Sequence, residues 1–383
     1  MVPEAIQRPC LGFSGKVSIA STVRSATWCD LQVTLLATSQ LGSRSSAATV
    51  RPMNQSMPHL NSTLPRILVA VDGTNLVHRS HHASAASDRR DAAGTPVWAL
   101  AGVVRMLASS VKEITNLWRE PTGIVVCFDG SHDACRRRNL DAGYKATRRD
   151  PNPDLDAHLA GVPALLSAAG ISVLTVEGQE ADDGCASATT VAAAAGWHCV
   201  VVTSDRDALA HASGTTRVLR PVNGGGWSAF GPSEIAAKYG LPKDYPGGAG
   251  FPAYAAYAAL RGDKSDELPG VGGLGNKTAA VVISALAGVG RTVEDAYRGD
   301  SVAGGALRER HLKLLLAGQG NYERNRTLMD AVVDLDVDLD VASRPLDEER
   351  AGYACGLHGV ADVAGLLGGL LGRRTASPAD IGT

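Results

Sequence analysis

The sequence has no CxxC pair of cysteines and no long apolar run. Its seven cysteines are scattered and odd in number, which argues against a zinc site and against a disulfide framework. The apolar runs, such as that at 200–202, fall far short of the roughly 20 residues that a membrane-spanning helix requires. We therefore expect a soluble protein with reduced thiols, in a reducing compartment and without a membrane partner.

The chain also lacks a large excess of either charge, with 37 basic and 39 acidic residues and a net charge of −2. Residues 1–64 hold five of the basic and two of the acidic residues, so the remainder of the chain carries a net charge of −5. A nucleic-acid-binding protein is usually basic. The overall charge therefore favours an ordinary acidic enzyme, unless the acidic residues are gathered at one site.

Residues 1–64 lack sustained hydrophobic periodicity and hold sixteen serines and threonines. We expect a disordered N-terminal extension, because this composition cannot bury enough apolar surface to offset the entropy of ordering. Its serines, arginines and scarcity of acids are typical of an organellar transit peptide. A true start at Met53 or Met57 is the alternative interpretation. Residues 372–383 are expected to form a tail.

Apolar runs of strand length alternate with helix-length segments between residues 65 and 231. The expected strands are 66–73, 123–130, 171–178, 198–205 and 216–221, and the expected helices are 96–118, 153–170 and 180–196. Strands that are apolar throughout are buried on both faces, so this alternation predicts an α/β fold with a mostly parallel sheet flanked by helices. From 232 to 371, helical patterns and glycine-rich turns predict a second, all-helical subdomain.

Acidic residues follow the expected strands at the point where each strand ends. Three strands end in Asp72, Asp129 and Asp205, and a fourth is followed by further acids. The full set is Asp72, Asp129, Glu180, Asp182, Asp183, Asp205, Asp207, Asp263 and Asp266. A single aspartate in such a place is commonly the N-cap of the next helix. The carboxyl ends of parallel strands meet at one edge, however, so we expect these side chains to converge there.

So many carboxylates at one edge require counter-charge, because like charges within a few ångströms raise each other's pKa. A donor set of oxygens without Cys or His favours Mg²⁺, with Mn²⁺ as the close substitute. Two such ions about 4 Å apart can activate a water molecule and stabilise the leaving oxygen of a phosphodiester. The sequence therefore predicts metal-dependent phosphodiester hydrolysis.

A basic segment at 135–149 comes directly after the second expected strand. It contains Arg136, Arg137, Arg138, Lys145, Arg148 and Arg149, together with Tyr144. A run of this kind is often only a solvated surface. Its place beside the acidic residues, and a tyrosine that can stack on a base, favour contact with phosphate and nucleic acid instead.

The glycine-rich stretch 268–280 resembles two nucleotide-binding motifs and fits neither. Gly270, Gly272 and Gly275 satisfy GxGxxG, but no apolar strand precedes them, and Asn276 interrupts a P-loop pattern before Lys277. We interpret the stretch as a helix, a glycine hairpin that includes Gly273, and a second helix. Exposed backbone amides and a helix N-terminus suit a DNA backbone phosphate. An ordinary connection between helices is the alternative.

Two further features are interpreted without a functional role. His81 and His82 lie in a Ser/Ala-rich stretch without a partner motif and are expected in a solvated loop. Tyr254 and Tyr257, three residues apart on an expected helix, are predicted to pack in the core rather than stack on a ligand. The acids of 333–341 have the spacing of a calcium loop but lack its turn glycine.

Five motifs, in order along the chain, resemble the bacterial 5′-3′ exonuclease family, the flap-endonuclease-like domain that precedes the polymerase in DNA polymerase I. They are VDGTNLVHR, FDG followed by RRR and YKATR, QEADD, TSDRD and GDKSDELPGVGGLGNKTA. The resemblance covers residues 66 to about 371. It implies a PIN-like α/β core over 65–231, a helical arch over 131–153 and a helix-three-turn-helix module in the helical subdomain.

The resemblance also implies roles for individual residues. Seven acids match the family's metal-binding residues, namely Asp72, Asp129, Glu180, Asp182, Asp205, Asp207 and Asp263, and Asp183 and Asp266 extend the cluster. Tyr144, Lys145 and Arg148 match the motif at the base of the arch, where Lys145 and Arg148 are expected to be catalytic. The arch arginine corresponds to Arg136 or Arg137, because the segment before Tyr144 is one residue longer than is usual. Gly270 to Lys277 match a duplex-binding hairpin that in this family also holds a potassium ion.

The function expected from this resemblance is a structure-specific 5′ nuclease that acts on DNA with a 5′ flap or a 5′ end at a duplex junction, in replication and repair. We expect a monomer of the stand-alone form, with a separate DNA polymerase as a candidate partner. A bacterial cytoplasmic location is expected, or an organellar one if residues 1–64 are a transit peptide. A PIN-type ribonuclease would lack the hairpin module. A catalytically silent DNA-binding protein would have a broken set of acids, whereas all seven are present here.

Overall fold

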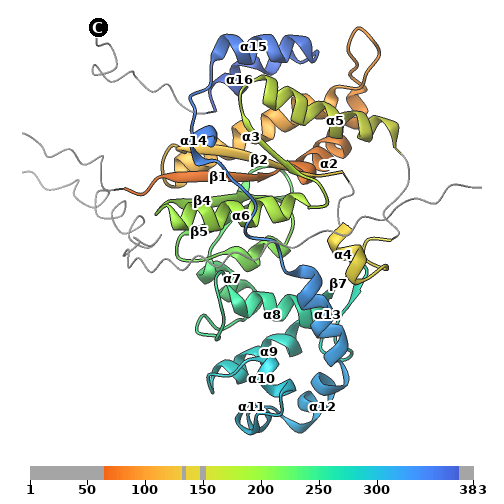
Figure 1. Cartoon of the computed structure of the whole chain (residues 1–383), viewed down its shortest axis with the longest axis vertical. Helices are drawn as coiled ribbons and strands as arrows, with labels where there is room; N and C mark the ends of the chain where they lie inside the picture. Colours follow the sequence, from red (N-terminus) through yellow and green to blue (C-terminus); the bar gives the residue numbers. More distant parts are fainter. Residues whose placement is uncertain (1–63, 132–134, 147–151, 371–383) are drawn as a thin grey trace, which may run out of the picture.

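A six-stranded sheet lies at the centre of the computed structural model, which describes residues 64–131, 135–146 and 152–370 (Figure 1). The strands are β1 (Ile67–Asp72), β2 (Gly123–Asp129), β3 (Ser172–Val176), β4 (His198–Val202), β5 (Thr216–Pro221) and β6 (Trp227–Phe230). They lie in the order β3-β2-β1-β4-β5-β6, and all neighbours are parallel except β5 and β6. The five expected strands are therefore present, and β6 is an antiparallel edge strand that the sequence did not predict.

Alternate residues of the buried strand β1 pack in two different cores. Leu68 and Ala70 belong to a core that includes α6 (Ala181–Ala194). Ile67, Val69 and Val71 face the other way, toward α2 (Gly73–Ser84), α3 (Trp98–Leu117) and α5 (Pro153–Ala168). Because successive side chains of a strand point to opposite faces, both faces of the sheet are covered by helices. The predicted fold class is confirmed.

A helical subdomain follows the sheet and lies below it in Figure 1. It comprises α7 (Pro232–Tyr239), α8 (Pro252–Arg261), α9 (Asn276–Ala287), α10 (Val293–Tyr297), α11 (Ser301–Ala306), α12 (Glu309–Ala317) and α13 (Gln319–Met329). Between α8 and α9 lie the two-residue strands β7 (Gly262–Asp263) and β8 (Leu268–Pro269). Tyr254 and Tyr257 of α8 are buried, as the sequence predicted. No helix among the described residues is long and apolar enough to span a membrane.

After α13 the chain leaves the helical subdomain and returns to the α/β core. There α14 (Leu339–Ala342) contacts β2, α15 (Glu348–Leu357) packs on α5, and α16 (Ala364–Gly368) packs on α3. The connecting segment is tied to α6, since the Val332 amide donates to Asp183 and the Leu335 amide donates to Ser187. This differs from the prediction of one helical subdomain over 232–371. Helices α15 and α16 contribute Ala351, Cys355 and Leu367 to the core that also contains the buried residues of α3 and α5.

The prediction of a solvated loop at His81 and His82 is wrong. Both residues belong to α2; His82 is exposed, as expected, but His81 is buried beside Trp98 of α3 and His158 of α5. The Nδ1 atoms of His81 and His158 are 3.1 Å apart, and the Asn152 side-chain amide lies 3.3 Å from His81 Nε2. The partners of His81 come from distant helices, so no local pattern could indicate its burial.

Candidate active site

Five of the predicted acids line one cavity at the carboxyl edge of the sheet. The cavity has a volume of about 410 Å³, and its walls include Asp72, Asp129, Glu180, Asp182 and Asp205 together with Thr74, Asn75, His78, Lys145 and Ala181. We call these five carboxylates the acid edge. In the sheet β1 lies between β2 and β4. The chain runs outward from β1 to β2 and β3 on one side and to β4 and β5 on the other, so the strand order reverses direction at the acid edge. Ligands of open α/β sheets bind at such a switch point.

Two members of the acid edge are fixed by hydrogen bonds at the strand ends. Asp72 is the N-cap of α2, since its Oδ1 accepts from the Asn75 amide at 2.9 Å, and its Oδ2 accepts from the Thr203 hydroxyl at 2.8 Å. Asp129 accepts from the Ala181 amide at 2.8 Å, which joins the end of β2 to the start of α6. The N-cap interpretation therefore holds for Asp72, and the same residue also faces the cavity.

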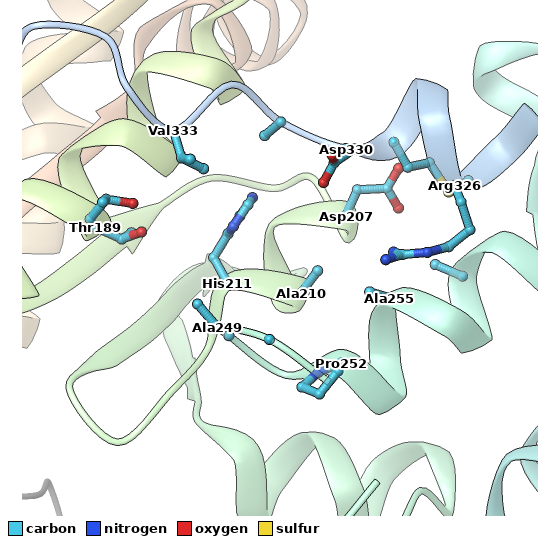
Figure 2. Close-up of a pocket in the computed structure, with 16 residues that line it drawn as sticks. Thr189, Asp207, Ala210, His211, Ala249, Pro252, Ala255, Arg326, Asp330 and Val333 are labelled. Carbon is cyan, nitrogen blue, oxygen red and sulfur yellow. The ribbon is translucent and has the colours of Figure 1, made fainter. Parts of the chain in front are cut away.

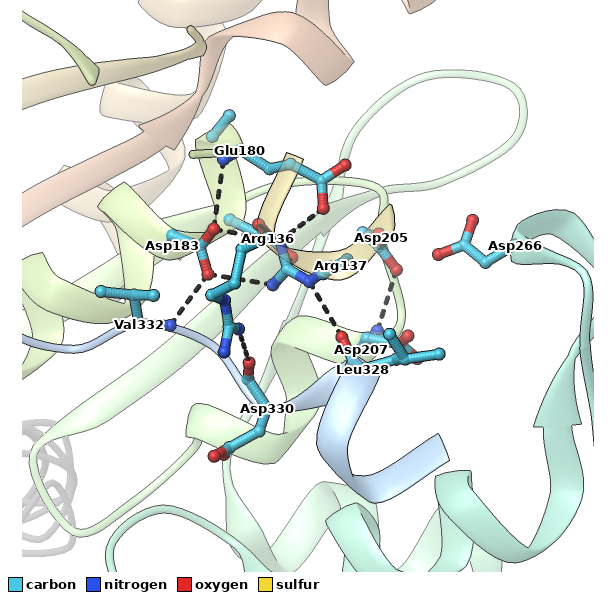
Figure 3. Close-up of polar contacts among 12 residues, drawn as sticks. Arg136, Arg137, Glu180, Asp183, Asp205, Asp207, Asp266, Leu328, Asp330 and Val332 are labelled. Atoms are coloured by element: carbon cyan, nitrogen blue, oxygen red, sulfur yellow. Dashed lines mark hydrogen bonds and ion pairs between the residues drawn. The ribbon is translucent and has the colours of Figure 1, made fainter. Parts of the chain in front are cut away.

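Asp183 is buried and does not line this cavity. Its Oδ2 accepts from the Glu180 amide at 3.1 Å in a capping box at the start of α6, and its Oδ1 accepts from the Val332 amide at 2.8 Å. Both oxygens also contact Arg137 (Figure 3). In this structure Asp183 holds together the start of α6, the connector after α13 and the arch segment.

The remaining predicted acids lie next to the acid edge. A small adjoining cavity is lined by Asp207 together with Asp72, Asp182 and Asp205. The Asp207 amide donates to Asp205 Oδ1 at 2.9 Å. Asp263 is buried beside Arg206 and Arg261, at 3.6 and 3.7 Å.

Burial raises the pKa of several of these carboxyl groups. It is the largest cause of the increase at Asp72, whose pKa is about 7, and at Asp129, whose pKa is about 6. The pKa of Asp207 is raised to about 8 by burial and then by Asp205, Asp263 and Asp266. The site is therefore short of positive charge at neutral pH.

The arch segment supplies two cations and a tyrosine to the acids. The segment includes α4 (Cys135–Leu140), where the buried Arg137 contacts Glu180, Asp182 and Asp183 (Figure 3). Lys145 Nζ contacts Glu180 Oε1. The Tyr144 hydroxyl lies 3.2 Å from Glu180 Oε2 and 3.4 Å from Asp266 Oδ2.

These positions differ from a simple phosphate-contacting surface. Tyr144 and Arg137, both predicted to contact DNA, are buried against carboxylates. Arg136 instead donates to the Asp330 carbonyl at 2.5 Å. Arg148 lies outside the described residues. The pairing of Arg137 with Asp183 could not be predicted from the sequence, because the two residues come from separate elements.

Among the described residues, no three His, Cys, Asp or Glu side chains converge closely enough to form a ready-made metal site. The donor chemistry nevertheless fits a hard divalent ion, because the cavity walls offer carboxylate oxygens and neither sulfur nor a Cys/His pair. One oxygen, Asp207 Oδ1, is buried and has no hydrogen-bond partner in the described structure.

The predicted duplex-binding hairpin lies apart from this cavity. Gly272, Gly273, Gly275 and Lys277 are exposed, and Lys277 is in the first turn of α9. Gly270 allows a close backbone approach, since a Cβ atom there would lie 2.2 Å from the Arg261 carbonyl oxygen. Gly273 has a φ of +79°, which favours glycine. The helix, hairpin and helix therefore form as expected, with the turn open to solvent.

A second cavity, of about 320 Å³, lies between α6, α8 and the end of α13 (Figure 2). Its polar walls include Asp207, His211, Arg326 and Asp330. Burial lowers the pKa of His211. The sequence did not indicate the last three residues, because they belong to no motif: His211 ends the turn after β4, and Arg326 and Asp330 lie at the end of α13.

Comparison with known proteins agrees with this arrangement. A family model described as 5′-3′ exonuclease, N-terminal resolvase-like domain, matches residues 67–240. Those residues include the sheet and the acid edge, so the part of the chain that carries the site is similar to this family. DNA polymerase I of Mycobacterium tuberculosis is 35% identical over 272 residues, which are 70% of this chain and 27% of that protein. The chain thus spans about a quarter of the length of this DNA polymerase I.

Two solved structures share the fold. One is the bacteriophage T5 D15 protein co-crystallized with metal ions, with a TM-score of 0.53 and 17% identity over 79% of this chain and 100% of the other. The second is a T5 flap endonuclease in a pseudo-enzyme-product complex with DNA and metal ions, with a TM-score of 0.51 and 17% identity over 80% and 99% of the two chains. At this identity the likeness shows the fold alone.

The raised pKa of Asp72 predicts how the stability of the metal-free protein depends on pH. The folded state binds this proton more tightly than the unfolded state, so the stabilisation is present below about pH 4 and is lost as the pH rises through about 7. Asp72→Asn removes this loss and retains an oxygen to cap α2. In EDTA at pH 8 we expect the variant to be more stable than the wild type by about 2 kcal/mol, and at pH 5 by much less.

Chemical unfolding at both pH values measures this difference. Asp336→Asn, at an exposed position, controls for the loss of one negative charge. Equal destabilisation of Asp72→Asn at both pH values would contradict the electrostatic account and would leave Asp72 with a capping role only.

Proposed function

We propose that this chain is a metal-dependent, structure-specific 5′ nuclease that hydrolyses DNA phosphodiester bonds near 5′ ends. The observation that carries the proposal is the acid edge itself. Five carboxylates from four places in the sequence line one cavity at the switch point of the sheet, with Lys145 in the same wall. The match of residues 67–240 to the 5′-3′ exonuclease family model supports the reaction type.

The residues expected to hold two Mg²⁺ ions, or Mn²⁺ in their place, are those of the acid edge together with Asp207, with Asp263 and Asp266 beside them. When bound, such ions supply an activated water molecule and stabilise the charge that develops on the phosphate. The metal ions in the related T5 structures are consistent with a divalent ion in this fold. The glycine hairpin is a candidate site for K⁺.

The chain's own cations would divide the work of handling DNA. Lys145 lines the cavity, where a positively charged group can stabilise the reacting phosphate. Lys277 and the exposed amides of the hairpin are suited to hold the backbone of a duplex away from the cut. A DNA-bound T5 flap endonuclease with the same fold supports DNA as the substrate class.

The alternatives fit the chain less well. A catalytically silent DNA-binding protein would have no need for five carboxylates in one cavity, where burial raises the pKa of Asp72 and Asp129. A PIN-type ribonuclease would not require the hairpin between α8 and α9. The monomeric state, a separate polymerase partner and the cellular location stay predictions.

A labelled DNA duplex with a 5′ flap tests the proposed reaction. We expect cleavage with Mg²⁺ or Mn²⁺ and none with EDTA. Asp205→Ala should lower the single-turnover rate about 100-fold or more while DNA binding is retained, because the side chain is placed to hold an ion rather than DNA. The exposed Asp336→Ala serves as the matched control. Cleavage in EDTA, or an unchanged rate for Asp205→Ala, would overturn the proposal.

Lys145 and Lys277 are predicted to affect different steps. Lys145→Ala should lower the cleavage rate at saturating enzyme far more than it weakens binding, since a cation at the reacting phosphate acts mainly in the transition state. Lys277→Ala should weaken binding and reduce the log–log salt slope by about one, with little change in the saturated rate. Binding isotherms at several salt concentrations, together with single-turnover kinetics, separate the two effects. If both variants lose only affinity, Lys145 is a binding residue and not a catalytic one.

A further inference from the structure

Arg137 is a buried cation of the arch segment with several carboxylate partners. Its side chain is 2% exposed, and its guanidinium group contacts the carboxylates of Glu180 and Asp183 (Figure 3) and that of Asp182. The contacts to Asp183 are bidentate, at 2.9 and 3.0 Å, and those to Asp182 are longer, at 3.2 and 3.4 Å. A further contact joins Arg137 Nη1 to Glu180, and Nε donates to the Leu328 carbonyl at 2.9 Å.

Two of these three carboxylates belong to the acid edge. Both oxygens of Asp182 contact Arg137. One oxygen of Glu180 contacts Arg137 and Tyr144, and the other contacts Lys145. The oxygens of Glu180 and Asp182 are therefore already engaged by cations and a hydroxyl of the chain. These two acids line the cavity but are turned toward the chain's own cations.

The third carboxylate gives Arg137 a partner that does not depend on the acid edge. Asp183 is buried, lies outside the cavity wall and keeps its bidentate contact through Oδ1 and Oδ2. The Leu328 carbonyl at the end of α13 holds Nε from the other side. The guanidinium group can thus stay in place when Glu180 and Asp182 turn toward another cation.

We propose that Arg137 is the internal counter-ion of the acid edge: it holds Glu180 and Asp182 in the metal-free protein and thereby weakens the binding of divalent ions. Arg137 is a positioning residue in this account and not a DNA contact. Its charge offsets the repulsion among buried carboxylates before any ion arrives, and the same charge opposes an ion that takes over those oxygens. The inference rests on the metal-dependent function proposed above.

The test is calorimetric titration of Mn²⁺ into the full-length protein at pH 8, without DNA. We expect Arg137→Gln to bind Mn²⁺ about tenfold more tightly than the wild type, because a nearby positive charge is removed. The same variant should unfold at a lower temperature in EDTA and recover most of that loss when Mn²⁺ is added. Arg136→Gln is the matched control, since it removes the same charge one residue away, where the side chain contacts the Asp330 carbonyl.

Arg137→Lys covers the case in which Arg137→Gln does not fold. A lysine keeps the charge but lacks the planar fork that makes the bidentate contact with Asp183, so its Mn²⁺ affinity should be severalfold above that of the wild type. Weaker Mn²⁺ binding by either variant would show that Arg137 organises the metal ligands, and unchanged binding would leave it a purely structural role; each result overturns the inference. If the wild type binds no Mn²⁺, the proposed metal site fails as well.

Discussion

The pairing of buried carboxylates with a few cations is the interaction on which this site depends. Burial and mutual repulsion make the ionised form of Asp72 and Asp129 unfavourable, and both carry a raised pKa. Where cations are present, the balance changes. Burial acts to lower the pKa of Arg137, and the attraction of Asp182, Glu180 and Asp183 outweighs burial and raises it. Within the acid edge, Glu180 and Asp182 are thus paired with cations of the chain, whereas Asp72 and Asp129 have a raised pKa.

The fold creates this division through its topology. Three parallel strands deliver Asp72, Asp129 and Asp205 to one edge, and a capping box at the start of α6 places Glu180 beside them. The arch segment covers these acids from the other side with Arg137 and Lys145. The chain then crosses back from α13 to the core, and its backbone supplies Leu328 and Val332 as further partners of the same network. Segments far apart in the sequence are therefore joined through a few charged groups.

The sheet and the location of the acids could be predicted from the sequence, because each depends on a local pattern. An apolar run followed by an aspartate marks the end of a parallel strand, and the order of the runs places these ends on one edge. The glycine hairpin could be predicted for the same reason, because its turn depends on glycines that are close together in the sequence.

Features that depend on contacts between distant elements could not be predicted. His81 is buried because α3 and α5 bring Trp98 and His158 to it. Arg137 stands in a basic run and looks like its neighbours in the sequence. In the structure it contacts Asp183, whereas Arg136 contacts the Asp330 carbonyl and Lys145 contacts Glu180. The return of 339–370 to the core likewise depends on packing against α3 and α5.

The measurement that tests the central claim most directly is anomalous diffraction at the manganese edge from crystals of this protein soaked in Mn²⁺. The account predicts anomalous peaks inside the cavity, within coordination distance of carboxylate oxygens of Asp72, Asp129, Glu180, Asp182 or Asp205. It also predicts that Arg137 keeps its contact with Asp183 in the loaded crystal. An acid edge without a peak at saturating Mn²⁺, or peaks only at other carboxylates, would contradict the account.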